Sequence, residues 1–310
     1  MLARTAENMY WMGRYLERME GTARLINATT HMLIDSHQDA RISWPVLIDV
    51  LGEDPQGFIQ EGSSSELGVM HYLIEAEDSP ASIRNSCNQL RTNARCVREV
   101  IPRDFWEEIN SLNLFMQTEC TLASSRVRRY SLMVEVVRRC QMVVGVMDGT
   151  MLRDDAFCVF NIGRHLERAD MTTRIMDTLI LQQLTPTEGH SSRRQFQWTS
   201  LLNALGGTEP YRRYFAQEEG ETDVIDFLMS YPEFPRSICF CLQKIESAVK
   251  RLPRSDGVLA AIARLRGGVD SEPLASLSTE RLHLLIDQIQ ARFIDLHSAL
   301  TEESFKAPDT

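Results

Sequence analysis

Apolar residues recur with helical spacing along nearly the whole chain, with polar residues between them. The 16 glycines and 11 prolines mostly fall between these periodic stretches, where they separate one helix from the next. No stretch shows the sustained alternation and tight turns that are typical of strands. The pattern predicts an all-α protein with helices over 3–37, 44–51, 64–76, 80–101, 104–121, 125–150, 154–183, 197–205, 209–218, 222–231, 236–252, 256–266 and 276–303.

Capping residues predict several helix starts. Ser79-Pro80, Thr222-Asp223 and Ser278-Thr279-Glu280 each offer a capping oxygen, a proline or an early acid. Residues 186–196 are polar and lack the apolar period, so they are predicted to link two helices.

The chain also repeats itself. Three blocks of the first half recur in order in the second: Gly13–Arg24 as Gly163–Arg174, 44–52 as 198–206, and 69–83 as 224–238. Their offsets of 150, 154 and 155 residues are nearly constant, which indicates a tandem duplication. We therefore expect a multi-helix bundle with internal pseudo-twofold symmetry, one all-helical domain over 1–310 with halves of roughly 1–150 and 151–310.

The first block, with seven of twelve positions identical between its copies, places charges along one side of a helix. At about 100° per residue the charged positions fall in a stripe about 120° wide, beside the apolar face. The stripe comprises Glu7, Arg14, Glu17, Arg18 and Arg24 in the first half, and Arg164, Glu167, Arg168 and Arg174 in the second.

Two interpretations of the stripes stay open. Glu20–Arg24 and Asp170–Arg174 are ordinary helix-stabilising pairs, whereas the arginines four residues apart repel each other. A glycine inside a helix lowers helix stability by roughly 1 kcal/mol relative to alanine. Because a glycine nevertheless recurs in both copies of the block, we expect the helices to approach each other closely there. Either a buried Arg/Glu network locks the halves together, or a polar cavity near the pseudo-axis binds an anion or carboxylate.

Other basic positions are candidates for the same cavity. Arg84, Arg91, Arg95 and Arg98 share one helix face, and Arg236 opens a helix whose N-terminal N–H groups favour anions. The full set of candidate anion-binding residues is Arg14, Arg18, Arg24, Arg164, Arg168, Arg174, Arg84, Arg95 and Arg236, supported by Glu7, Glu20, Asp170 and His165.

Composition narrows the function classes. The formal net charge of −10 argues against a general nucleic-acid binder, which needs a basic face. No apolar run of 18 residues and no signal-peptide pattern is present, so we expect a cytoplasmic protein without a membrane segment. The seven cysteines are irregularly spaced, which predicts neither a disulfide framework nor a zinc site.

Familiar catalytic motifs are missing from the sequence. It has no phosphate-binding glycine loop, no zinc His-Glu-x-x-His motif and no nucleophile elbow. Glu280-Arg281-Leu282-His283 is one Glu-x-x-His, and a di-iron bundle needs two. We therefore expect no metal and no cofactor.

Several blocks resemble the bacterial alpha-E proteins, a family catalogued as a domain of unknown function. The matching blocks are Ala3–Arg18, Ser82–Ser86, Asn93–Arg95, Gly163–Asp170 and Phe234–Ser237, and the resemblance spans essentially the whole chain. It implies an all-α protein whose genes typically accompany a circularly permuted ATP-grasp ligase, often with a transglutaminase-like peptidase. The implied role lies in a peptide or amide-ligation system, with these two proteins as partners.

Two functions are thus expected as alternatives. In the first, an accessory protein binds the ligase, or a carboxylate- or phosphate-bearing substrate, through the arginine stripes. In the second, the protein is itself an enzyme that uses Glu17 and Glu167 as acid/base groups. Neighbouring arginines would lower the pKa of a glutamate and make it a poor acid at neutral pH, which disfavours the second function.

Overall fold

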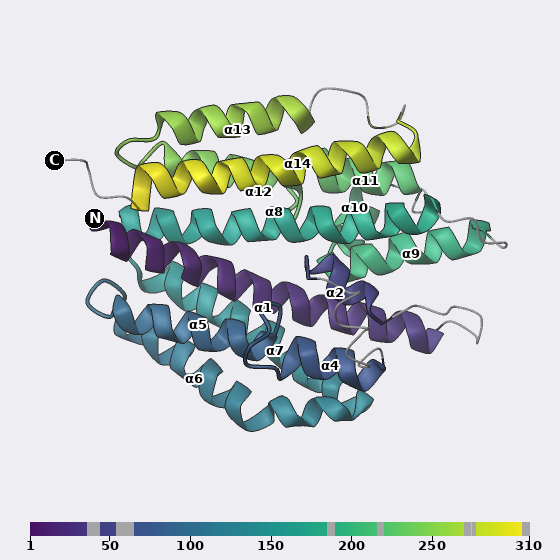
Figure 1. Ribbon diagram of the computed structural model, residues 1–310, viewed down its shortest axis with the longest axis horizontal. Helices are drawn as coiled ribbons and strands as arrows, with labels where there is room; N and C mark the ends of the chain where they lie inside the picture. Colours follow the sequence, from purple (N-terminus) through teal and green to yellow (C-terminus); the bar gives the residue numbers. More distant parts are fainter. Residues whose placement is uncertain are drawn as a thin grey trace. The chain divides into compact units, whose positions relative to one another are not determined.

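The computed structural model describes residues 1–35, 44–53, 65–184, 190–215, 220–269, 274 and 277–305, and over these it contains helices and no strand (Figure 1). The all-α prediction is therefore confirmed for the described part of the chain. Two compact units divide it, Met1–Glu167 and Arg168–Thr310, and the boundary falls inside one long helix. No helix among the described residues is both long and apolar enough to span a membrane.

The first unit is assembled around its first helix. Its helices are α1 (Ala3–Asp35), α2 (Val46–Val50), α4 (Glu66–Ile74), α5 (Ile83–Cys96), α6 (Arg103–Glu119), the 3-10 turn η1 (Cys120–Ser124), α7 (Arg126–Thr150) and the first part of α8 (Asp155–Leu184). Helices α5 and α7 both pack along α1, and α6 packs on α5 and α7. The apolar faces of these helices close one core that includes Tyr10, Phe105 and Phe160.

The second unit continues from α8. It adds α9 (His190–Leu205), α10 (Thr208–Tyr214), α11 (Glu221–Ser230), α12 (Ile238–Val249), α13 (Asp256–Val269), α14 (Thr279–Leu300) and a short π-helical turn, η3 (Thr301–Phe305). Helix α13 packs against α12 and α14, and α11 against α9 and α12. Trp198, Tyr211 and Phe227 are fully buried between them.

Several predicted boundaries differ from those in the structure, and two helix starts show why. Helix α9 begins at His190, so most of the predicted polar link 186–196 is helical and 186–189 lies outside the described residues. The first turn of α9 is polar and lacks apolar residues at helical spacing. The periodic pattern therefore predicted the start of α9 too late in the sequence. Helix α5 begins at Ile83, because Ser82 and not Ser79 supplies the capping hydroxyl.

The two units share small structural details at the repeated blocks. Gly52 and Gly206 both adopt the left-handed conformation, with φ of 80° and 66°, just after α2 and α9. Ser82 and Ser237 both cap a helix: each hydroxyl accepts a hydrogen bond from the N–H three residues ahead, at 2.9 and 3.0 Å. Each also donates to the carbonyl six residues back, at 2.5 Å.

These two caps give a test of the repeated structure. Because both hydroxyls are fully buried, Ser82→Ala and Ser237→Ala each leave a buried N–H and carbonyl without a partner. We expect each to lower the free energy of unfolding by about 1–3 kcal/mol, measured by denaturant titration. Ser65→Ala removes the exposed cap of α4 and should cost less than about 1 kcal/mol. Equal costs at all three sites would contradict a special role for the buried pair.

Candidate functional site

Helices α1 and α8 approach each other closely at two glycines in the first unit. A Cβ atom on Gly13 would lie 2.1 Å from the carbonyl oxygen of Phe160, and one on Gly163 would lie 2.2 Å from that of Tyr10. The contacts are reciprocal, since Gly13 and Gly163 are equivalent in the repeat, as are Tyr10 and Phe160. The two motif helices therefore meet backbone to backbone, as the recurring glycine had suggested.

The crossing places Glu167 between two arginines of α1. Arg14 Nε donates to Glu167 Oε2, while Arg18 donates from Nε to Oε1 at 2.5 Å and from Nη2 to Oε2 at 3.2 Å. The carboxylate is almost fully buried, with 4% of the residue exposed, and Arg14 and Arg18 are mostly buried. Such charge-assisted contacts hold both helices in one register.

A second ion pair runs in the opposite direction. Arg164 Nε lies 3.8 Å from the buried carboxylate of Glu17. Arg14 and Glu167 form one pair and Arg164 and Glu17 the other, so equivalent residues of the two motifs exchange partners. Together with Arg18, these residues form what we term the Arg/Glu network.

Aromatic side chains cover the α1 side of the network. Arg14 Nη1 donates to the hydroxyl of Tyr10 at 2.9 Å and its guanidinium lies 5.9 Å from the ring centre of Trp11. Arg18 lies 5.8 Å from the ring centre of Tyr15, which stacks on Trp11. These contacts fix both guanidinium groups on sides that Glu167 does not reach.

Electrostatics keep the network ionised. Burial alone would raise the pKa of Glu167, but Arg14 and Arg18 outweigh it and lower this pKa from 4.5 to about 2. Burial would lower the pKa of Arg18, but Glu167 raises it. Burial raises the pKa of Tyr10, against the effect of Arg14. At neutral pH Glu167 and Arg18 are therefore both charged, and each stabilises the charge of the other.

Several other candidates form local contacts. Arg24 pairs with Glu20 at 2.8 Å, and in the second unit Arg174 pairs with Asp170 at 3.0 Å, as their spacing predicted. His165 is buried, whereas Glu7 is exposed at the first turns of α1.

Arg168 and Arg236 each take part in contacts between α8 and the turn before α12 in the second unit. Arg168 Nη1 donates to the carbonyl of Pro235 at 3.4 Å, and the hydroxyl of Thr172 donates to that of Arg236 at 3.1 Å. Both arginines are mostly buried. These bonds attach the turn before α12 to α8.

The arginine row on α5 mostly fastens neighbouring segments. Arg84 pairs with Glu77 at 2.7 Å, and Arg91 donates to Asn110 of α6 at 2.8 Å. The predicted row was wrong for Arg98, because α5 ends at Cys96 and Arg98 lies in the turn that follows. Arg91 and Arg98 both lie over the ring of Trp106, at 5.8 and 4.7 Å. Arg95 is exposed. The structure does not bring this row to the Arg/Glu network by any contact among those described.

The buried charged residue Arg129 was not identified from the sequence. Arg129 is 1% exposed and donates to Glu66 of α4, which also accepts from Arg126. These partners are about 60 residues apart and lie in no repeated block, so no local signal pointed to them.

Comparison with known proteins shows which family the chain is part of. The Alpha-E family, described as a predicted alpha-helical domain with a conserved ER motif, matches residues 1–305. The chain belongs to the Alpha-E family. Glu17-Arg18 and Glu167-Arg168 are Glu-Arg dipeptides inside the repeated motif of this Alpha-E chain, and their glutamates are the acids of the Arg/Glu network.

The curated relatives are themselves uncharacterized. Proteins of Mycobacterium bovis and of two Mycobacterium tuberculosis strains are each 25% identical over 272 residues, which is 82% of this chain. The Alpha-E chain spans only about 30% of the length of these relatives. No solved structure matches it.

Proposed function

We propose that this Alpha-E chain is a non-catalytic, accessory helical protein of an ATP-grasp-dependent peptide or amide-ligation system. The observation that carries the proposal is the state of Glu167, whose two carboxylate oxygens are both held by Arg14 and Arg18 inside the first unit. By holding α1 and α8 in one register, the network fixes the shape of the protein surface around it.

The same geometry disfavours the enzyme alternative. A general acid or base works best when its pKa lies near the working pH. Glu167 has a pKa of about 2, so it carries no proton to donate at neutral pH and is a weak base. Its lone pairs are already occupied by guanidinium N–H groups.

Charge gives the accessory protein a means of binding. The Arg/Glu network contains three guanidinium groups, those of Arg14, Arg18 and Arg164. Guanidinium groups suit the bidentate binding of a carboxylate or phosphate of the substrate, or of an acidic side chain of the ligase. The arginine stripes are therefore the proposed binding region for an anionic partner.

Two further observations support a role alongside other proteins. The family resemblance implies a circularly permuted ATP-grasp ligase and often a transglutaminase-like peptidase as neighbours. The curated relatives are more than three times as long as the segment they share with this chain, as expected if an Alpha-E segment works next to other domains. We propose a cytoplasmic location, where ATP is available to the ligase.

We also propose that the fold arose by tandem duplication about a pseudo-twofold axis. The exchanged partners of the two motifs, the two left-handed glycines and the two serine caps are each related by the sequence offsets of 150 to 155 residues.

Co-purification tests the proposed function. The tagged chain, expressed together with a circularly permuted ATP-grasp ligase from the same genome, should retain the ligase through washing. The pair should form an amide bond with ATP consumption at a rate at least 10-fold above the ligase alone, measured by phosphate release and mass spectrometry.

Controls separate the alternatives. Arg103→Ala removes a fully exposed helix pair and should leave both readouts unchanged. A chain that neither retains nor stimulates the ligase would contradict the accessory role. Amide formation by the chain alone that is lost in a folded Glu17→Gln variant would support the enzyme alternative.

A further inference from the structure

Two helices of the second unit bring together three metal-ligating side chains. His283 and Asp287 lie on α14, and Asp177 lies on α8. His283 Nδ1 is 2.7 Å from Asp177 Oδ1, and His283 Nε2 is 3.6 Å from Asp287 Oδ2. One ligand atom from each of the three residues can be chosen so that all lie within 4.8 Å of one another.

The local sequence explains why these ligands converge. His283 and Asp287 are four residues apart on a helix and therefore share a face. Asp177 comes from the neighbouring helix and is mostly buried, with 13% of its side chain exposed, while His283 is 24% and Asp287 52% exposed. The cluster is thus anchored on its inner side and open to solvent on its outer side.

We propose that Asp177, His283 and Asp287 form a binding site for a divalent transition-metal cation of the Zn²⁺ class. Imidazole nitrogen combined with carboxylate oxygen suits Zn²⁺ and its neighbours better than Mg²⁺ or Ca²⁺, which prefer oxygen alone. Two carboxylates with a neutral imidazole carry two negative charges, which match a dication. Three protein ligands leave a further position for water or a bound molecule, as in open zinc sites.

The distances require only side-chain adjustments. Ligand atoms around a tetrahedral zinc ion at about 2.0–2.1 Å lie roughly 3.3 Å from one another. Asp177 lies at Nδ1 of the His283 ring and Asp287 at Nε2, so an ion held by Nδ1 and Asp177 requires Asp287 to swing around the ring edge, with all three ligand atoms starting within 4.8 Å of one another. Rotation of the partly exposed Asp287 can supply most of this change.

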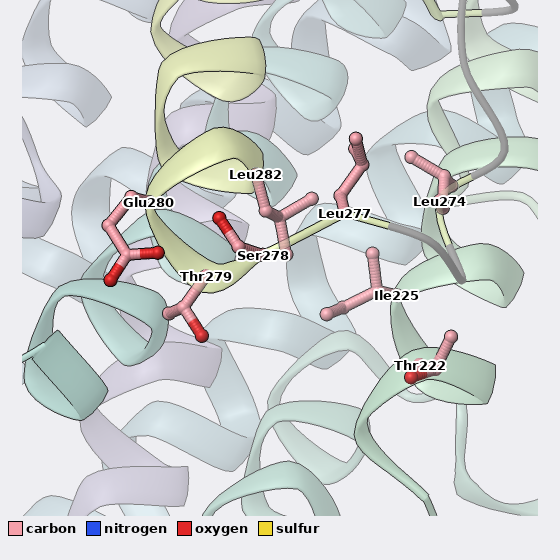
Figure 2. Close-up of a pocket in the computed structure, with 8 residues that line it drawn as sticks. All are labelled: Thr222, Ile225, Leu274, Leu277, Ser278, Thr279, Glu280 and Leu282. Atoms are coloured by element: carbon pink, nitrogen blue, oxygen red, sulfur yellow. The ribbon is translucent and has the colours of Figure 1, made fainter.

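A cavity borders the same end of α14. It has a volume of about 330 Å³, and Figure 2 shows Ser278, Thr279 and Glu280 of the first turn beside the apolar Ile225, Leu274 and Leu277. Glu280 lies one helical turn before His283. A small ligand in this cavity would therefore lie about one turn from the ion.

This inference replaces the expectation of no metal. Sequence analysis weighed Glu280 and His283 as half of a di-iron motif and found no second copy. The proposed ligands are instead His283 with two aspartates, and Asp177 is 106 residues away in sequence. Spacing along the chain could not reveal it.

Zinc titration of the full chain tests the site. By isothermal titration calorimetry at pH 7.5, the wild-type protein should bind one Zn²⁺ per chain, and Co²⁺ in its place should give the visible absorption of a low-symmetry site. His283→Ala and Asp287→Asn should each weaken Zn²⁺ binding at least 10-fold. Asp287 is half exposed, so its variant should fold as the wild type does, checked by circular dichroism.

A second histidine serves as the matched control. His71 on α4 is 67% exposed and lies 3.6 Å from Glu75, so it offers a similar pair of ligands on an open surface. His71→Ala should leave the high-affinity binding unchanged. Absence of binding by the wild type, or binding that survives in folded Asp287→Asn and is lost in His71→Ala, would overturn the proposal.

Discussion

Gly13→Ala is expected to destabilise the first unit by about 3 kcal/mol, near the upper end of the usual cost of overpacking. The added methyl group would lie 2.1 Å from the carbonyl oxygen of Phe160 and 2.8 Å from the N–H nitrogen of Arg164. Both are backbone atoms of α8, so no side chain can rotate away and the helices must separate. The gain of about 1 kcal/mol in helix propensity offsets only part of this cost.

Denaturant unfolding followed by circular dichroism measures this effect. Gly145→Ala is the matched control, because Gly145 is inside α7 and a Cβ there meets nothing within 4 Å. That variant should gain about 0.5–1 kcal/mol. A Gly13→Ala protein as stable as the control would disprove the close crossing.

The second glycine sharpens the test. Gly163→Ala alone should cost about as much as Gly13→Ala, because its Cβ would lie 2.2 Å from the carbonyl oxygen of Tyr10. Once the first alanine has separated the helices, the second meets less resistance. The double variant should therefore cost clearly less than the sum of the single variants.

Sequence analysis could predict this crossing because its signal is local and repeated. A glycine at an equivalent helical position in each half, beside arginines at like spacing, predicted close approach. It could not choose between a lock and a cavity, because burial of Glu167 depends on which face of α8 meets α1. The helical wheel likewise grouped Glu7 with the buried charges, although Glu7 is exposed near the start of α1.

Contacts between side chains of different helices could not be predicted from the periodic pattern of the sequence. Arg91 and Arg98 were predicted to share one anion-binding helix face, but Arg98 lies beyond the end of α5 and both side chains lie over Trp106 of the next helix. A periodic pattern identifies one face of a helix and leaves the neighbour of that face undetermined. The zinc-type cluster on α8 and α14 was missed for the same reason.

Glu167→Gln should have the larger effect on stability, about 3–5 kcal/mol, because it removes the negative charge that Arg14 and Arg18 share in a mostly buried site. The amide retains one acceptor oxygen, but it carries no charge. Chemical denaturation at pH 7 measures the loss. Glu107→Gln, in an exposed pair with Arg103, should change stability by less than about 0.5 kcal/mol.

The pH dependence gives the same prediction an independent measurement. The pKa of Glu167 is lowered from 4.5 to about 2 in the folded protein, so its stabilising contribution is present above about pH 4.5 and is lost as the pH falls toward 2. The difference in unfolding free energy between wild type and Glu167→Gln should shrink over that interval by on the order of 3 kcal/mol. A difference that stays constant from pH 6 to pH 2.5 would contradict the ion pairs.

A triple apolar variant then separates stability from function. Replacing a whole buried ionic cluster by apolar residues of similar volume is often neutral or stabilising, whereas removing one partner is costly. Arg14→Met, Arg18→Met and Glu167→Met combined should therefore recover most of the stability that Glu167→Gln loses. If this protein folds and still retains the ATP-grasp ligase, the network acts only as a lock between α1 and α8. If it folds but no longer retains the ligase, the charges themselves recognise an anionic partner.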